Sequence, residues 1–144
     1  MDSLDSQHPI PLFVYGTLKP GEFFYSRYCE AYVISAQEAI VRGLLFALPL
    51  GYPALAEGSD WVQGYLLHLQ PDALEAIDEL EDYDPTRAAG DNEYERVEVE
   101  VFDLAQNSLG KAWTYYMELK RILTLRGQWL PKGLWTGNFE SIEF

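Results

Sequence analysis

The chain has 144 residues, 48% of them hydrophobic and 23% charged, a composition that fits one globular domain and excludes an intrinsically disordered chain. Its 23 acidic and 10 basic side chains give a formal net charge of −13, which repels nucleic acid and anionic membranes, so we expect neither as a partner. Cys29 is the single cysteine, which excludes an intrachain disulfide and favours a reducing, cytoplasmic compartment.

Residues 1–11 are polar and acidic and have no signal-peptide core, so we expect a flexible lead-in. No apolar run approaches the roughly 20 residues that a membrane-spanning helix needs. We expect the main domain at 12–117 and an extension at 118–144 that packs back onto it.

The stretch 14–21 follows a first predicted strand and is interrupted by Gly16, Pro20 and Gly21. Backbone N–H groups in such a concave turn can bind a carboxylate or a phosphate. The simpler interpretation is an ordinary turn whose glycines are required for steric reasons. The glycine spacing matches a P-loop, but Glu22 follows where that motif has lysine, so no nucleotide phosphate is expected here.

The next segments alternate between apolar runs and turn residues. Residues 23–32 predict a short helix, and 33–48 predict a strand bent at Gly43. Residues 51–54 predict a rigid turn. Residues 61–69 predict a further strand, with a bulge at Gly64 as one interpretation.

A helix is predicted from Asp72 to about residue 81, because proline and aspartate open it in the expected way. The alternation of valine and glutamate in 94–102 predicts a strand with one buried face. A turn at 107–110 then leads to a second strand at 111–117, completing a hairpin. At least five strands with one or two helices indicate an α+β fold, either a small curved sheet or a barrel.

Glu81 departs from the pattern of its own helix. The apolar stripe consists of Ala73, Leu74, Ala76, Ile77 and Leu80. The opposite, wet face consists of Asp72, Glu75, Asp78, Glu79 and Asp82. Glu81 falls among the apolar residues, where burial and the negative helix end would raise its pKa and make it a better general base. Alternatively, the helix ends earlier and Glu81 points into water.

No metal site is expected, because His8 and His68 have no ligand-like spacing to acidic residues or to Cys29. No cofactor is expected either.

Three motifs, at 14–21, 77–83 and 94–97, occur in this order, and with them residues 12–117 resemble the γ-glutamylcyclotransferase-like family. That family includes plant avirulence-induced proteins and γ-glutamylamine cyclotransferases. The resemblance implies a small mixed, largely antiparallel β-barrel with flanking helices. It also implies closure of a γ-glutamyl group to 5-oxoproline, with release of an amine from a small-molecule substrate.

The resemblance assigns roles to individual positions. Glu81 matches the catalytic glutamate, although Asp82 follows it where the family often has glycine. The implied substrate-binding residues are Tyr15, Gly16, Thr17, Leu18 and Tyr116. A different class of function stays open: a non-catalytic binding module for an acidic metabolite or a protein partner. A related lyase or amidohydrolase is a third hypothesis, and the oligomeric state is not indicated.

Overall fold

The computed structural model describes residues 9–16, 19, 32–49, 51–80, 86 and 94–135, and only the backbone of residues 79 and 80. Its elements are β1 (Ile10–Val14), β2 (Val33–Ala47), β3 (Pro53–Leu69), α3 (Asp72–Leu80), β4 (Glu95–Phe102), β5 (Ser108–Tyr116), α4 (Leu119–Thr124) and β6 (Gln128–Trp129). The helix predicted at 23–32 falls, apart from Tyr32, outside the described residues.

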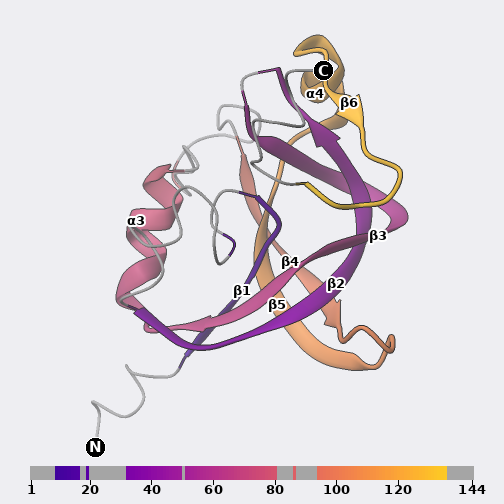
Figure 1. Cartoon of the computed structure of the whole chain (residues 1–144). Helices are drawn as coiled ribbons and strands as arrows, with labels where there is room; N and C mark the ends of the chain where they lie inside the picture. Colours follow the sequence, from indigo (N-terminus) through magenta and orange to yellow (C-terminus); the bar gives the residue numbers. More distant parts are fainter. Residues whose placement is uncertain are drawn as a thin grey trace, which may run out of the picture.

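Five strands close into a ring (Figure 1). β1 pairs antiparallel with β3 and parallel with β5, and β5 pairs antiparallel with β4. β2 completes the ring by pairing antiparallel with β4 and β3, and β6 extends it along β2. The predicted α+β fold with a small, largely antiparallel barrel is therefore confirmed.

The pairing of the long strand β2 with β3 is irregular at Gly43, where the sequence predicted a bend. Its register against β3 moves from Gly43 opposite Asp60 to Leu44 opposite Ala56, so the partner strand carries extra residues at this point. A Cβ at Gly43 would lie 2.7 Å from Leu55 Cδ1, which leaves no room for a larger residue. Because β3 carries the extra residues, this bulge lets β3 curve around the ring.

The bulge predicted at Gly64 is wrong, because the β2–β3 register runs through this position without a shift. A Cβ there would lie 2.2 Å from the carbonyl oxygen of Val14, so the glycine instead permits the close approach of β1. The turn predicted at 51–54 is also wrong in its second half, since β3 begins at Pro53. Proline is compatible with the first residue of a strand.

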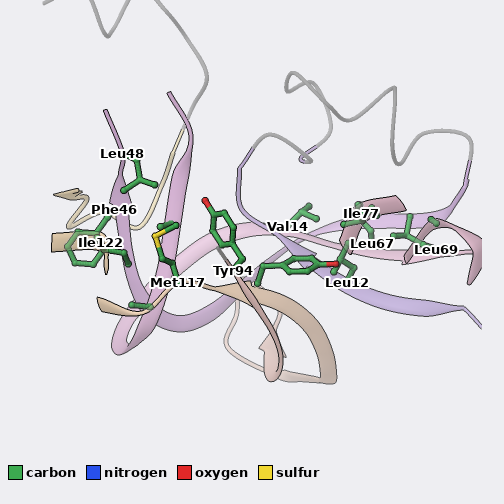
Figure 2. Packing of buried hydrophobic residues seen from close by; sticks show 14 residues of the cluster. Leu12, Val14, Phe46, Leu48, Leu67, Leu69, Ile77, Tyr94, Met117 and Ile122 are labelled. Carbon is green, nitrogen blue, oxygen red and sulfur yellow. The ribbon is translucent and has the colours of Figure 1, made fainter. Parts of the chain in front are cut away.

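Successive strand residues point to opposite faces and build two apolar clusters. The helix-packed cluster is formed by Leu12, Val14, Phe46, Leu48, Ala54, Ala56, Leu67, Leu69, Ala73, Ile77, Tyr94, Tyr115, Met117 and Ile122 (Figure 2). The strand cluster is formed by Phe13, Tyr15, Ala39, Val41, Leu45, Leu55, Val62, Leu66, Val101, Ala112 and Trp135. Because α3 and α4 contribute only to the first, the helices cover the outer face of the ring and the strand cluster fills its inside.

Helix α3 confirms the predicted element and most of its predicted orientation, with two exceptions. Ala73 and Ile77 are fully buried, whereas Ala76, which was placed in the apolar stripe, is exposed. Asp78, which was placed on the wet face, is largely buried against the β4–β5 hairpin. The helix turns this side to the sheet because the hairpin supplies hydrogen-bond partners for the carboxylate.

The β4–β5 hairpin confirms the alternation predicted for 94–102, with Glu98 and Glu100 exposed and Val101 buried. The turn predicted at 107–110 is wrong, because β5 already begins at Ser108. The chain turns at 103–107 instead, where the Asp103 carboxylate accepts the N–H groups of Asn107 and Ala105. These bonds, the Asn107 N–H first, lower the pKa of Asp103.

The described residues beyond the hairpin, up to Trp135, pack back onto the barrel. Ile122 of α4 is fully buried, β6 pairs Trp129 with Phe46 of β2, and Trp135 joins the strand cluster. None of the helices in the described part of the chain has the length and apolar character required to cross a membrane.

Candidate active site

Tyr15 and Gly16 stand at the end of β1, where the first motif begins. The Tyr15 side chain is only 7% exposed, and its hydroxyl donates a hydrogen bond of 2.6 Å to the carbonyl oxygen of Tyr115. A Cβ on Gly16 would lie 2.6 Å from Pro53 Cγ and 2.8 Å from its Cδ. The chain therefore leaves β1 pressed against β3, and only glycine fits there without displacing the proline ring.

Lys19 ties the first motif to the C-terminal region. Its N–H donates to the carbonyl oxygen of Gly16 at 2.9 Å, and its side chain is only 5% exposed. Its Nζ donates to the carbonyl oxygen of Trp135 at 2.5 Å and lies 6.0 Å from the centroid of that ring. Trp135 thus packs over the beginning of the motif as well as into the strand cluster.

Tyr116 lies at the end of β5 and packs against the strand cluster, to which Tyr15 also belongs. The structure therefore brings these two predicted site residues to the same face of the sheet. Burial raises the pKa of Tyr116, and the nearby Glu57 carboxylate raises it further. A phenol is already protonated at neutral pH, the upward shift keeps it so at higher pH, and it can therefore donate a hydrogen bond. Opposite it on β4, the side chain of Glu95 has a buried carboxylate oxygen without a hydrogen-bond partner among the described residues.

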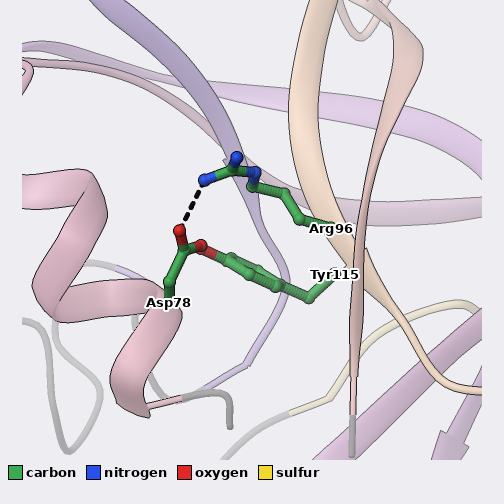
Figure 3. Close-up of polar contacts among 3 residues, drawn as sticks. All are labelled: Asp78, Arg96 and Tyr115. Atoms are coloured by element: carbon green, nitrogen blue, oxygen red, sulfur yellow. Dashed lines mark hydrogen bonds and ion pairs between the residues drawn. The ribbon is translucent and has the colours of Figure 1, made fainter. Parts of the chain in front are cut away.

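Asp78 is the centre of a polar network on the other face of the hairpin (Figure 3). Its Oδ1 accepts the Tyr115 hydroxyl at 2.5 Å, and its Oδ2 accepts Arg96 Nη1 at 2.5 Å. The Arg96 guanidinium also lies 5.1 Å from the centroid of the Trp113 ring. Sequence reasoning missed this group because helical periodicity placed Asp78 in water, although the second and third motifs contain both members of the ion pair.

Three predicted site residues, Thr17, Leu18 and Glu81, lie outside the described residues. Their described neighbours in the sequence are nevertheless informative. Gly16 directly precedes Thr17, and Asp78 precedes Glu81 by three positions, close to one helical turn. Within the described ranges, no group of His, Cys, Asp or Glu side chains is arranged to hold a metal ion.

A comparison with models of protein families shows which family this chain is related to. Residues 12–136 match the model of the family described as gamma-glutamyl cyclotransferase, AIG2-like. The chain belongs to this family. The match extends beyond the resemblance in 12–117 and includes Trp135, which packs on the first motif.

Relatives within the gamma-glutamyl cyclotransferase, AIG2-like family support this assignment. The gamma-L-glutamyl-butirosin B gamma-glutamyl cyclotransferase of Niallia circulans is 37% identical over 106 residues, which cover 72% of this chain and 64% of that protein. A putative gamma-glutamylcyclotransferase of Halalkalibacterium halodurans is 37% identical over 105 residues, which cover 72% of this chain and 89% of that protein.

Solved structures show the same fold at lower identity. An AIG2-like protein from Mus musculus superposes with a TM-score of 0.56 at 22% identity, covering 76% of this chain and 78% of that chain. An uncharacterized protein from Pyrococcus horikoshii gives a TM-score of 0.60 at 20% identity, covering 93% of this chain and 92% of that chain. Both support the barrel architecture.

Proposed function

We propose that this protein is a γ-glutamyl cyclotransferase that converts a γ-glutamyl amide into 5-oxoproline and a free amine, with Glu81 as the general acid/base. Family membership supports the reaction class. The observation that carries the proposal is a pair of hydrogen bonds, from Tyr15 to the Tyr115 carbonyl and from the Tyr115 hydroxyl to Asp78. These bonds connect Tyr15 of the first motif to the helix that leads to Glu81.

The proposed reaction needs one proton carrier and no outside reactant. The α-amine of the glutamyl group attacks its own γ-carbonyl carbon, so a C–N bond forms within the ring and the original amide C–N bond breaks. An α-ammonium group holds its proton at neutral pH, which makes a base necessary before attack. In this proposal Glu81 accepts that proton and returns it to the leaving amine, and the second proton that the attacking nitrogen loses on ring closure passes to the same amine, which leaves as an ammonium ion.

The first motif would bind the glutamyl end. The N–H groups of residues 16–18 would hold the α-carboxylate or the oxyanion that develops at the γ-carbonyl. Both reacting groups belong to one molecule, so holding the folded conformer accelerates ring closure by orientation. Tyr116, which stays protonated and lies on the face shared with Tyr15, would donate to the substrate. The proposal also includes a cytoplasmic location, for which the single Cys29 is the support.

The test is product analysis with a panel of γ-glutamyl amino acids and γ-glutamylamines. We expect 5-oxoproline and the free amine in equal amounts. Glu81→Gln is expected to lower kcat by a factor of about 10²–10⁴, the usual contribution of a general acid/base. Glu75→Gln on the exposed face of α3 is the matched control and should leave kcat unchanged.

Each other result points to a different function. Free glutamate in place of 5-oxoproline would identify a hydrolase on the same scaffold. Binding without turnover by any member of the panel would indicate a binding module. Full activity of Glu81→Gln would contradict the role of Glu81.

A further inference from the structure

Asp78 occupies an unusual position for an acidic residue near the end of a helix. Both of its carboxylate oxygens accept hydrogen bonds, one from the Tyr115 hydroxyl and one from Arg96 (Figure 3). The partners come from the two strands of one hairpin, 37 and 18 residues away along the chain. A carboxylate held at two points by a separate element fixes the rotation of the helix as well as its distance from the sheet.

Arg96 complements the helix in charge. The last turn of α3 has no basic residue of its own, so the negative end of the helix is compensated by no cation from within it. Arg96 brings a guanidinium from β4 to that end, and the side chains of Arg96 and Asp78 are only 18% and 14% exposed. In an ion pair this far removed from water, removing one partner leaves the other charge uncompensated and lowers the stability of the fold.

Tyr115 joins this helix end to the end of β1. Its hydroxyl donates to Asp78, while its own carbonyl oxygen accepts the Tyr15 hydroxyl at 2.6 Å. The preceding residue adds a second bond to β1, since Thr114 Oγ1 donates to the Phe13 carbonyl oxygen at 2.9 Å. Two consecutive residues of β5 therefore hold both the end of β1 and the last turn of α3.

We propose that Asp78, Arg96 and Tyr115 are positioning residues for the cyclotransferase reaction, because they hold the last turn of α3, which directly precedes Glu81 in the sequence, to the end of β1, which leads into residues 16–18. This inference rests on the function proposed above. None of the three needs to touch the substrate. Their effect comes from geometry, since a displacement of about 1 Å in a reacting group can lower a rate by about 10²-fold.

The test compares three conservative variants with two matched controls. Arg96→Lys and Tyr115→Phe each change one contact to Asp78, Asp78→Asn changes both, and all three preserve most of the side-chain volume. Glu75→Gln makes the same charge change at an exposed site on α3. Arg42→Lys replaces an exposed arginine that also stacks on tryptophan, at 3.6 Å from the Trp61 ring centroid.

The expected kinetic result is a fall in kcat of about tenfold to a hundredfold for the three network variants, with KM changed by less than about threefold. The controls should stay within about twofold of the parent protein. The double variant Asp78→Asn/Tyr115→Phe should be no worse than the poorer single variant, because both changes break the same link. Full kcat in the network variants, or a loss explained entirely by the unfolded fraction, would overturn the proposal.

A second measurement separates this inference from the proposed reaction. Hydrogen exchange can follow the amides of residues 16–18 and 79–82 in the folded protein. Asp78→Asn and Tyr115→Phe should increase exchange in both segments together, whereas Glu75→Gln should change neither. If the parent protein makes no 5-oxoproline, the proposed function is wrong. The hydrogen-exchange result then shows by itself whether the two segments are coupled. Faster exchange in one segment without the other would overturn it.

Discussion

Tyr115 and Tyr116 are neighbours on β5, yet they belong to two differently stabilised regions. Tyr115 points to the helix-packed cluster, where its hydroxyl binds the Asp78 carboxylate. Tyr116 points to the strand cluster, where its surroundings are mainly apolar and its pKa is raised by burial. Directional polar bonds therefore orient α3 on the outer face, whereas close apolar packing maintains the inside of the barrel.

This difference separates two requirements of the proposed site. A catalytic side chain must be held in one orientation, and hydrogen bonds to a charged group provide that. Strand pairing closes a barrel and removes its edges. Close apolar packing then fills the inside through the hydrophobic effect. We therefore expect the loss of an apolar side chain to lower stability most inside the barrel, and the loss of a polar contact to matter on the outer face.

The largest stability effect is expected on the inside of the barrel. Leu55 is fully buried in the strand cluster, so Leu55→Ala should lower the free energy of unfolding by about 2–5 kcal/mol through lost burial and a cavity. Urea unfolding measures this value. Leu104→Ala at an exposed leucine is the control and should stay within about 0.5 kcal/mol of the parent. An equal loss at both positions would contradict the assignment of the core.

On the outer face, a polar contact should contribute to stability beside the apolar packing. Asp78→Ala leaves the guanidinium of Arg96 without its carboxylate in a site mostly out of water, and we expect a loss of about 3 kcal/mol. Asp78→Ala/Arg96→Met should lose less than the sum of the two single changes in a double-mutant cycle. Additive losses would show that the two side chains act independently, contrary to the structure.

Gly16→Ala tests the junction between the two regions. The added methyl would lie 2.6 Å from Pro53 Cγ, and the proline ring is too rigid to move away easily. The expected loss is about 1–3 kcal/mol, as for other overpacked sites. Pro53→Ala in the same protein removes the colliding atoms and should recover part of the loss. Thermal unfolding that is unchanged in Gly16→Ala would refute the steric requirement.

The smallest effect concerns alkaline pH. The pKa of Tyr116 is raised above its ordinary value of 10.0, so its contribution to stability is complete below that pH and disappears as the pH rises through the folded pKa. As the pH rises from neutral through the pKa of Tyr116, Tyr116→Phe should therefore lose less stability than the parent protein. Urea unfolding at a series of pH values measures the difference, and identical pH slopes would contradict the burial of this phenol.

Much of the fold could be predicted because it depends on local pattern. The valine–glutamate alternation of 94–102 identified β4, and the apolar residues of 72–80 identified α3. Gly43 marked the irregular pairing between β2 and β3, although the extra residues at that point belong to β3. In each case, the information is contained within a few neighbouring residues.

The orientation of Asp78 could not be predicted in this way. Helical periodicity places a carboxylate in water by default, and only partners brought close by the folded hairpin reverse that preference. The bond from Tyr15 to Tyr115 likewise joins residues 100 positions apart. The sequence predicted the turn at 107–110, where glycine is the stronger turn signal. The turn forms earlier instead, because the Asp103 side chain accepts hydrogen bonds from Asn107 and Ala105.

We propose that Glu81 and residues 16–18 form one site. A crystal structure of Glu81→Gln with a γ-glutamyl amide bound tests it most directly, because the variant should bind the substrate without converting it. We expect the glutamyl α-amine about 3 Å from the side chain at position 81, with its α-carboxylate at the N–H groups of residues 16–18. A substrate bound elsewhere, or a side chain at position 81 directed away from it, would contradict the account.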